Sequence, residues 1–225
     1  MHKDPRQIRR MFGSLARRYD LLNRVLSLSL DRRWRKAVVQ ELEPQAGHRA
    51  LDLCCGTADL ALELLAVGLE VVGADFSHEM LVQANRKAPT LPLVEADALN
   101  LSFPDASFDL VTIAFGLRNL ADYGAGLREF RRVLRPGGRL AVLEFSVPTA
   151  AAFRRVYHLY LKRLVPAVGS ALSRRHGAYR YLADTVQAFP DQKELGRLIE
   201  DSGFGPTRWV NLTGGIAALH LASKD

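Results

Sequence analysis

An apolar stretch that ends in a glycine, followed by an acid 19 residues after that glycine, contains the residues best placed to bind a ligand. The stretch RALDLCCG (49–56) has the composition of a buried strand that ends in a tight turn at Gly56. A second apolar stretch, EVVGAD, ends at Asp75. Such a pair is typical of a nucleoside site, because glycine lets the backbone approach the ligand and the carboxylate accepts hydrogen bonds from ribose hydroxyls.

The residues around Gly56 favour a ligand without phosphate. A dinucleotide-binding turn has the pattern G-x-G-x-x-G, but Ala58 and Ala61 occupy the second and third glycine positions. Asp59, in the first turn of the expected helix, and Asp52, on the expected strand, would repel phosphate. S-adenosylmethionine has a sulfonium, an ammonium and a ribose but no phosphate, and it fits these charges. The alternative is structural: Gly56 turns the chain and the acids cap a helix.

Other polar residues follow expected strands further along the chain. Asp97 stands where a carboxylate can accept a hydrogen bond from the adenine amine, with the backbone of Ala98 beside it. Arg118 and Asn119 follow a longer apolar strand, and polar residues at the carboxyl end of a central strand lie at the ligand crevice of α/β sheets. They are therefore candidate substrate residues. The alternatives are a turn-forming Asp, an ion pair and a turn-forming Asn.

The positive charge lies in two segments outside the expected nucleoside-binding part. The 225 residues carry a formal net charge of +7, and 48% are hydrophobic, which is enough for a full core. Residues 1–36 contain eleven Lys or Arg and three acids, and residues 149–183 contain seven and none, whereas residues 37–148 contain nine against fifteen acids. Basic amphipathic segments with aromatic residues are typical of contact with anionic membranes or nucleic acid. The alternative is a solvated helix face.

Cysteine and histidine usage indicates a reducing compartment and no metal site. Cys54 and Cys55 are adjacent, so neither a disulfide framework nor a zinc motif is present. His158, His176 and His220 are not at mutual ligand spacing. No apolar run reaches the roughly 18 residues of a membrane span. We expect a cytoplasmic protein without metal, with peripheral contact at the inner face of the membrane.

The order of periodic segments predicts an α/β fold. Two amphipathic helices are expected at 5–25 and 31–43, with Asp31 as the N-cap of the second. Strands and helices then alternate, which predicts a mostly parallel sheet with helices on both faces. The expected strands are 49–54, 70–75, 91–95, 108–115, 139–146, 206–212 and 216–222, the last two joined at Thr213-Gly214-Gly215, and the expected helices between them are 58–66, 78–88, 122–134 and 192–202, with caps at Ser77 and Asp191.

We expect a single domain over residues 1–225, built from four segments. Residues 150–188 interrupt the alternation and are expected to be helical, with a bend at Pro166 and Gly169. We interpret this insertion as a lid or substrate wall. The four segments are an N-terminal helical cap (1–45), a cofactor-binding core (46–148), the helical insertion (149–190) and a terminal helix with a hairpin (191–225).

Six segments of the sequence resemble the ubiquinone/menaquinone biosynthesis C-methyltransferases. The resemblance covers nearly the whole chain and implies a class I S-adenosylmethionine-dependent methyltransferase fold with seven strands. The glycine turn is shared by many methyltransferases, whereas the first, third, fifth and sixth segments are more specific. The segments are YDLLNRVLSLSLDRRW (19–34), LDLCCGTADL (51–60), TIAFGLRNL (112–120), RVLRPGGRLAVLEFS (132–146), YRYLADTVQAFPDQ (179–192) and NLTGGIAALH (211–220).

The resemblance also implies a set of cofactor residues in this chain. They are Thr57 in the turn, Asp75 on the ribose, Asp97 with Ala98 near the adenine, Ala114 through its backbone, and Gly56 with Asp52 in the same wall.

The implied reaction is methyl transfer to a ring carbon of a prenylated quinol, with demethylmenaquinol as the expected substrate. Arg118, Asn119 and Tyr19 are the expected catalytic residues, and the base that takes the ring proton is unassigned. A benzoquinol of ubiquinone biosynthesis is the alternative substrate. A nucleic-acid methyltransferase would carry an N-P-P-[YF] loop where FGLRN stands, so no nucleic acid is expected as a partner. The prenyl tail implies contact with an anionic membrane, and a homo-oligomer is a further expectation.

Overall fold

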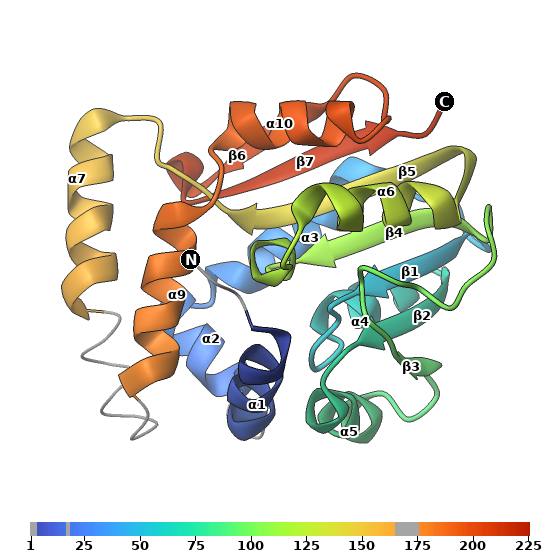
Figure 1. Cartoon of the computed structure of the whole chain (residues 1–225), viewed down its shortest axis with the longest axis horizontal. Helices are drawn as coiled ribbons and strands as arrows, with labels where there is room; N and C mark the ends of the chain where they lie inside the picture. The colour runs from blue at the N-terminus through green and yellow to red at the C-terminus, as the bar shows by residue number, and fades with distance from the viewer. Residues whose placement is uncertain (1–3, 17–18, 165–175) are drawn as a thin grey trace.

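The protein is built around one seven-stranded sheet. The structure, a computed structural model, describes residues 4–16, 19–164 and 176–225. The strand order is β3-β2-β1-β4-β5-β7-β6, and β7 runs antiparallel to β5 and β6 whereas the other pairs are parallel (Figure 1). The predicted sheet with a closing hairpin is therefore confirmed. The strands are β1 (Arg49–Leu53), β2 (Glu70–Asp75), β3 (Leu93–Glu95), β4 (Phe108–Ala114), β5 (Leu134–Phe145), β6 (Arg208–Leu212) and β7 (Ala217–Ser223).

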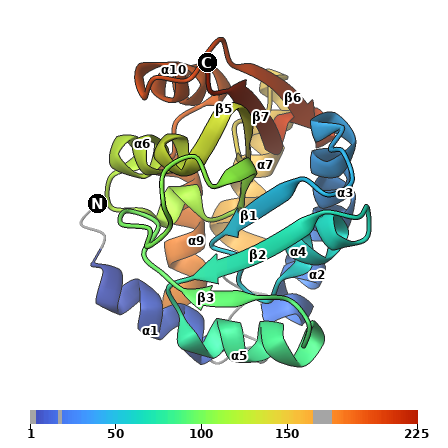
Figure 2. The ribbon, with the colours of Figure 1, turned by 90° about the vertical axis from the view of Figure 1, so that its right-hand side faces the viewer.

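Helices cover both faces of this sheet. The helices α6 and α10 pack on one face and α3 and α4 on the other, so that the sheet lies between two layers (Figure 2). The helices are α1 (Pro5–Leu15), α2 (Tyr19–Ser27), α3 (Leu30–Leu42), α4 (Asp59–Leu65), α5 (His78–Lys87), α6 (Tyr123–Val133), α7 (Ala151–Leu159), α9 (His176–Ala188) and α10 (Gln192–Asp201), with short turns η2 (Leu117–Asn119) and η4 (Thr213–Gly215) and a π-helical turn η3 (Tyr160–Leu164). None of the described helices is both long enough and apolar enough to cross a membrane.

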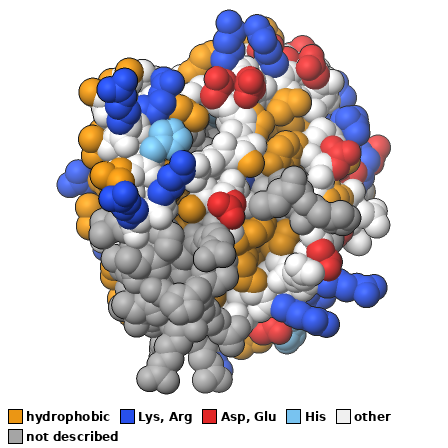
Figure 3. All heavy atoms as spheres, turned by 60° about the vertical axis from the view of Figure 1, so that its left-hand side comes forward, with side chains coloured by type: hydrophobic (Ala, Val, Ile, Leu, Met, Phe, Trp, Pro, Cys, Tyr) orange, Lys and Arg blue, Asp and Glu red, His pale blue; other side chains and the backbone are white. Residues whose placement is uncertain are grey.

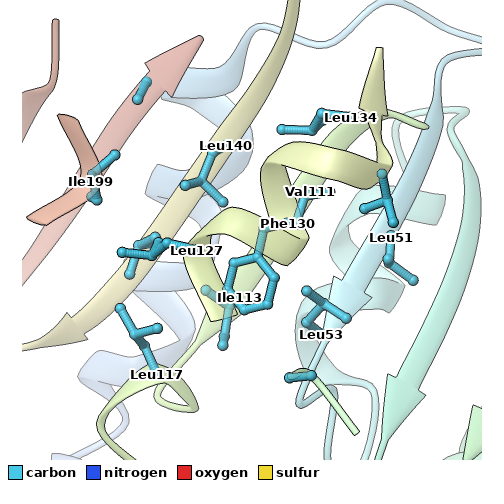
Figure 4. Packing of buried hydrophobic residues seen from close by; sticks show 14 of the residues in the cluster. Leu51, Leu53, Val111, Ile113, Leu117, Leu127, Phe130, Leu134, Leu140 and Ile199 are labelled. Carbon is cyan, nitrogen blue, oxygen red and sulfur yellow. The ribbon is translucent and has the colours of Figure 1, made fainter. Parts of the chain in front are cut away.

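Strand alternation places successive side chains of β1 in different layers. Leu51 and Leu53 pack in the core under α6, whereas Ala50 packs in the core under α3 and α4. The core under α6 is almost fully closed to solvent, and Figure 4 shows its side chains meeting between the helix and the strands. This packing fixes the carboxyl ends of β1, β2 and β4 at one edge of the sheet, where the candidate site residues follow. The residues in Figure 4 include Leu51, Leu53, Val111, Ile113, Leu127 and Phe130.

The prediction of one continuous helix over residues 5–25 is wrong. The structure has two helices, because α1 ends at Leu15 and α2 begins at Tyr19. The predicted cap of the next helix is also wrong: the N-cap of α3 is Ser29, at φ 62°, and Asp31 lies inside the first turn. Because Asp31 is the second residue of α3, its carboxylate bonds to Arg35 one turn later on the same helix.

The start of one strand also differs from the prediction. Strand β5 begins at Leu134 rather than 139, because Leu134 pairs with Phe108 before the register shifts to the pair Leu110 and Arg139. The turn residue Gly137, at φ 74°, lies in the bulge that this shift creates. The capping of α10 by Asp191 is confirmed, with reciprocal bonds to Glu194. The predicted bend at Pro166 and Gly169 lies outside the described residues.

Candidate active site

A cavity opens at the edge of the sheet where β1, β2 and β4 end, and we call it the strand-edge cavity. It encloses about 850 Å³ of empty space, which includes space open to solvent. The turn after β1, the end of β2, the loop after β3 and the end of β4 line its floor. Two aromatic residues from the N-terminal helices, Phe12 and Tyr19, line it from the other side. The predicted residues in its wall are Tyr19, Gly56, Asp75, Asp97, Ala98, Ala114 and Asn119.

Asp75 is fixed at the end of β2 by two backbone hydrogen bonds. Its Oδ2 accepts the N–H of Gly56 and its Oδ1 accepts the N–H of Ser77, both at 2.9 Å. The bond from Gly56 ties the turn after β1 to the end of β2. Burial raises the pKa of Asp75 to about 6, and the backbone bonds oppose this shift. Each oxygen keeps a lone pair for a ligand hydroxyl, so Asp75 is a preorganised acceptor.

A second carboxylate, Asp97, lines this cavity. Asp97 accepts the N–H of Leu99 at 2.9 Å, which holds the loop after β3 against the cavity, and the neighbouring Ala98 is buried. The described lining residues include two carboxylates and no Lys, Arg or His. A phosphate would therefore find no cationic partner in this lining, whereas a cationic nucleoside such as S-adenosylmethionine suits it. The residues present fit that ligand.

Two predicted cofactor residues lie beside this cavity and do not line it. Asp52 is two residues from Ala50 on β1, so its side chain lies on the same face of the sheet. It is buried there and accepts a hydrogen bond from the hydroxyl of Thr112 at 2.8 Å. Burial raises its pKa to about 7. The hydroxyl of Thr57 donates to Asp20 of α2 at 2.5 Å. Contact of Asp52 or Thr57 with a cofactor stays a prediction.

A second cavity, which we call the helical cavity, lies between α2, α3 and the segment that begins with α7. It holds about 1130 Å³ of empty space open to solvent and is lined mostly by apolar and aromatic side chains. Tyr19 and Phe115 belong to the walls of both cavities. Phe115 follows β4 with a positive φ of 58°, an uncommon conformation for a residue with a bulky side chain. The sequence gives no signal for that conformation, and Phe115 was missed as a site residue.

Arg118 lies in the wall of the helical cavity and forms a buried ion pair. Its Nη1 donates to Oε1 of Glu144 at 2.7 Å and to the carbonyl of Phe115 at 2.5 Å, and its guanidinium lies 5.2 Å from the ring centroid of Phe145. The Nε of Arg118 is buried and has no hydrogen-bond partner among the described residues. The ion pair considered as an alternative for Arg118 is therefore present, and one buried N–H remains for a ligand.

Asn119 and Tyr19 lie near the boundary between the cavities. Asn119 donates to the carbonyl of Phe115 at 3.4 Å, and its Oδ1 accepts the hydroxyl of Tyr181 at 3.1 Å. Burial raises the pKa of Tyr19, although a hydrogen bond with Asn23 and the charge of Arg118 oppose the shift. Tyr19 therefore stays protonated at neutral pH and can donate a hydrogen bond.

Asp31 and Arg35 form a buried ion pair in the wall of the helical cavity. The Nη2 of Arg35 lies 2.7 Å from Oδ2 of Asp31 and 2.9 Å from Oδ2 of Asp59, and Ser27 donates to Oδ1 of Asp31 at 2.6 Å. Among the described residues that line this cavity, Asp31 is the single carboxylate. Sequence reasoning missed this pair. The available signal was its spacing, because both residues fall on the apolar stripe of α3 with Trp34.

The two thiols and the histidines suggest no further chemistry in this part of the molecule. Burial raises the pKa of both Cys54 and Cys55 well above the usual range, so both stay protonated. In the described segments, no group of three or more His, Cys, Asp or Glu is arranged to hold a metal ion.

Comparison with known proteins gives matches over the whole chain. The chain matches the ubiE/COQ5 methyltransferase family over residues 1–224. It is 51% identical over 224 residues to a demethylmenaquinone methyltransferase of Mycolicibacterium vanbaalenii, and the alignment covers 100% of this chain and 97% of that protein. It is 46% identical over 224 residues to the demethylmenaquinone methyltransferase of Corynebacterium kroppenstedtii, with the same coverage.

Solved structures show the same fold at low sequence identity. A SAM-dependent methyltransferase of Thermotoga maritima has a TM-score of 0.71 at 18% identity, over 96% of this chain and 99% of that one. A phosphoethanolamine N-methyltransferase of Haemonchus contortus, solved with S-adenosylhomocysteine, has a TM-score of 0.62 at 16% identity, over 84% of this chain and 52% of that one. The fold is that of the class I S-adenosylmethionine-dependent methyltransferases, and the chain belongs to the ubiE/COQ5 methyltransferase family.

Proposed function

We propose that this protein transfers the methyl group of S-adenosylmethionine to a ring carbon of a prenylated quinol, converting demethylmenaquinol to menaquinol. The names of relatives about 50% identical over the full chain support this substrate. The observation that carries the proposal is the pair of cavities that share Tyr19 and Phe115. One cavity suits a cationic nucleoside and the other an apolar chain, and they meet where a methyl group would pass between their ligands.

The strand-edge cavity holds S-adenosylmethionine, which supplies a methyl group on its sulfonium. Asp75 accepts from the ribose hydroxyls and Asp97 accepts from the adenine amine, beside the backbone of Ala98. The backbone of Ala114 lies at the same cavity wall. The two carboxylates favour the cation over its neutral thioether product, which helps to exchange product for substrate. Gly56 completes this wall, placed by its bond to Asp75, and Thr57 and Asp52 lie beside it.

The helical cavity holds the quinol, with its ring toward Tyr19 and Phe115 and its isoprenoid tail along the apolar wall. Arg118 donates from its unpartnered Nε to a quinol oxygen and stabilises the phenolate that forms when the hydroxyl loses its proton, which makes the ring carbon nucleophilic. Tyr19 and Asn119 hold the ring at the boundary of the two cavities. Holding two substrates in line supplies much of the rate of such a transfer.

The ring carbon that gains a methyl group must lose a proton, and we assign Asp31 as the acceptor. It is the carboxylate in the described wall of the helical cavity, and its bonds with Arg35 and Ser27 hold its side chain in place. A carboxylate can take the proton directly or from a quinol hydroxyl through one water. The proton balance closes, because one proton is released for each methyl group transferred.

Replacing Asp31 with Asn is expected to lower kcat about 100-fold, since general-base catalysis contributes about 10²–10⁴-fold. The affinity for S-adenosylmethionine should not change, because Asp31 lines only the other cavity. The measurement is the steady-state rate with a short-tailed demethylmenaquinol. Asp31→His should restore part of the rate, with activity that rises through the titration range of histidine near pH 6.5.

Asp59→Asn is the matched control for that variant. Asp59 bonds the same Nη2 of Arg35 as Asp31 does but lines neither cavity, so its replacement perturbs Arg35 without removing the proposed acceptor. We expect Asp59→Asn to turn over near the wild-type rate. An equal loss in both variants would show that Asp31 acts only by holding Arg35.

The proposed reaction is tested by mass spectrometry of quinones from cells that lack the protein. We expect demethylmenaquinone to accumulate and the intact chain to restore menaquinone, whereas an Asp75→Ala chain should not. Accumulation of a demethylated benzoquinone would instead support the ubiquinone pathway. An unchanged quinone profile would contradict both, and methylation of RNA would then be measured. Homo-oligomerisation stays a prediction.

A further inference from the structure

Helix α7 lies at the side of the molecule with little of its surface packed. Of its nine residues, Tyr157 is buried, and the first six, from Ala151 to Val156, are all exposed. Figure 1 shows it standing at the edge of the fold, beyond the end of the sheet. Its apolar side chains point outward: Phe153 is 36% exposed, Val156 63% and Leu159 53%. An exposed helix with such residues indicates a contact surface.

Helix α2 and the turn after it expose a second set of apolar side chains. Leu21, Val25 and Leu28 are 57%, 40% and 79% exposed. Leu21 and Val25 lie one turn apart on α2, and Leu28 follows the end of that helix. Of these, Leu28 lines the helical cavity, as do Phe153 and Val156 of α7. Residues that are exposed and also line a cavity form its rim, so the two apolar sets frame the mouth of the helical cavity.

Exposed basic residues accompany this apolar rim on α7 and η3. Arg155, Lys162 and Arg163 on α7 and η3 are exposed, and residues 149–183 contain no acid. Figure 3 shows hydrophobic and basic side chains together on this side of the molecule. Apolar side chains flanked by Lys and Arg are the composition of surfaces that enter the headgroup region of an anionic bilayer. A nucleic acid would not bury the apolar residues, which makes lipid the better match.

We propose that the face formed by Leu21, Val25, Leu28, Phe153, Val156 and Leu159, here called the docking face, rests on an anionic lipid bilayer. The helical cavity then opens into the acyl region, and a prenyl tail can enter it without crossing water. This part of the inference rests on the proposed function, because it assumes a substrate that is dissolved in lipid. Binding of the docking face to lipid itself requires neither S-adenosylmethionine nor the quinol.

Flotation with vesicles tests the proposal. Intact protein should float with vesicles of phosphatidylcholine mixed with phosphatidylglycerol, and much less with phosphatidylcholine alone. The double variant Leu21→Asp/Leu159→Asp should lose binding by at least about tenfold, since each change removes apolar contact and adds repulsion. Neither residue lines a cavity, so turnover of a soluble short-tailed quinol should not change. Turnover of a long-tailed quinol in vesicles should fall with binding.

The matched control is Val67→Asp, which changes a residue 43% exposed at the end of α4, away from the docking face. This variant should float like the intact protein. Equal flotation of Leu21→Asp/Leu159→Asp and intact protein would overturn the proposal. Equal flotation of the intact protein with and without phosphatidylglycerol would also overturn it. A dimer in solution that the double variant converts to monomer would instead assign this face to a second copy. Because flotation uses vesicles without quinol, its failure would leave the proposed reaction untouched.

Discussion

Replacing Asp75 with Asn is expected to weaken the binding of S-adenosylmethionine about 100-fold. Bonds to a charged acceptor contribute about 1.5–3 kcal/mol each, and about 1.4 kcal/mol is a tenfold change in affinity. The measurement is titration calorimetry of the protein without quinol. Because burial raises the pKa of Asp75 to about 6, the ionised acceptor is lost as pH falls through 6. Affinity should therefore rise from pH 5 to pH 7 in the intact protein and much less in Asp75→Asn.

Asp109→Asn is the matched control for this experiment. Asp109 also joins two strands, since it accepts the N–H of Arg49 at 2.8 Å and bonds Arg135 at 2.7 Å, but it lies outside both cavities. It reports the structural cost of losing such a carboxylate. An Asp75→Asn protein that binds as well as Asp109→Asn would take Asp75 out of the site.

Replacing Arg118 with Ala is expected to lower kcat about 10²–10³-fold, the effect of losing one donor to a developing oxyanion. The same change leaves Glu144 buried without its cation, which should lower the free energy of unfolding by about 3–5 kcal/mol. Loss of activity in this variant alone therefore confounds two effects. Denaturant unfolding and steady-state rates must be measured together.

The double variant Arg118→Met/Glu144→Gln separates the two effects. It removes both buried charges and fills the space of the arginine stem, so it should recover most of the lost stability. Its turnover should stay low, with the affinity for S-adenosylmethionine unchanged, because Arg118 does not line the strand-edge cavity. If the double variant recovers full turnover together with stability, Arg118 has only a structural role.

The sheet and its order of elements could be predicted because they depend on local patterns. Strand alternation, the glycine turn and the cap at Asp191 are each set by a few neighbouring residues. The break between α1 and α2 could not be predicted, since Ile8, Leu15 and Leu22 continue one helical stripe across it. It is associated with long-range bonds: Asp20, next to Tyr19 in α2, reaches Thr57 and Lys87.

The candidate site was predictable where residues follow strands and not where helices approach from elsewhere. Asp75, Asp97 and Ala114 line the strand-edge cavity because strand order alone brings their strands together. The position of Asp52 follows from its alternation with Leu51 and Leu53, a signal that was present but outweighed by its nearness to Gly56. The helical cavity depends on tertiary packing of α2, α3 and α7, and periodicity contains no information on it.

The wall that the two cavities share has a kinetic consequence. Tyr19 and Phe115 separate a space for a water-soluble donor from a space for a lipid-soluble acceptor. S-adenosylhomocysteine can then leave into water and the methylated quinol into lipid, each by the route by which its substrate entered. The release of one product does not depend on the release of the other. S-adenosylhomocysteine should therefore inhibit in competition with S-adenosylmethionine and not with the quinol. The cell can then lower the rate of the reaction through the ratio of S-adenosylhomocysteine to S-adenosylmethionine, without any change in the quinone pool.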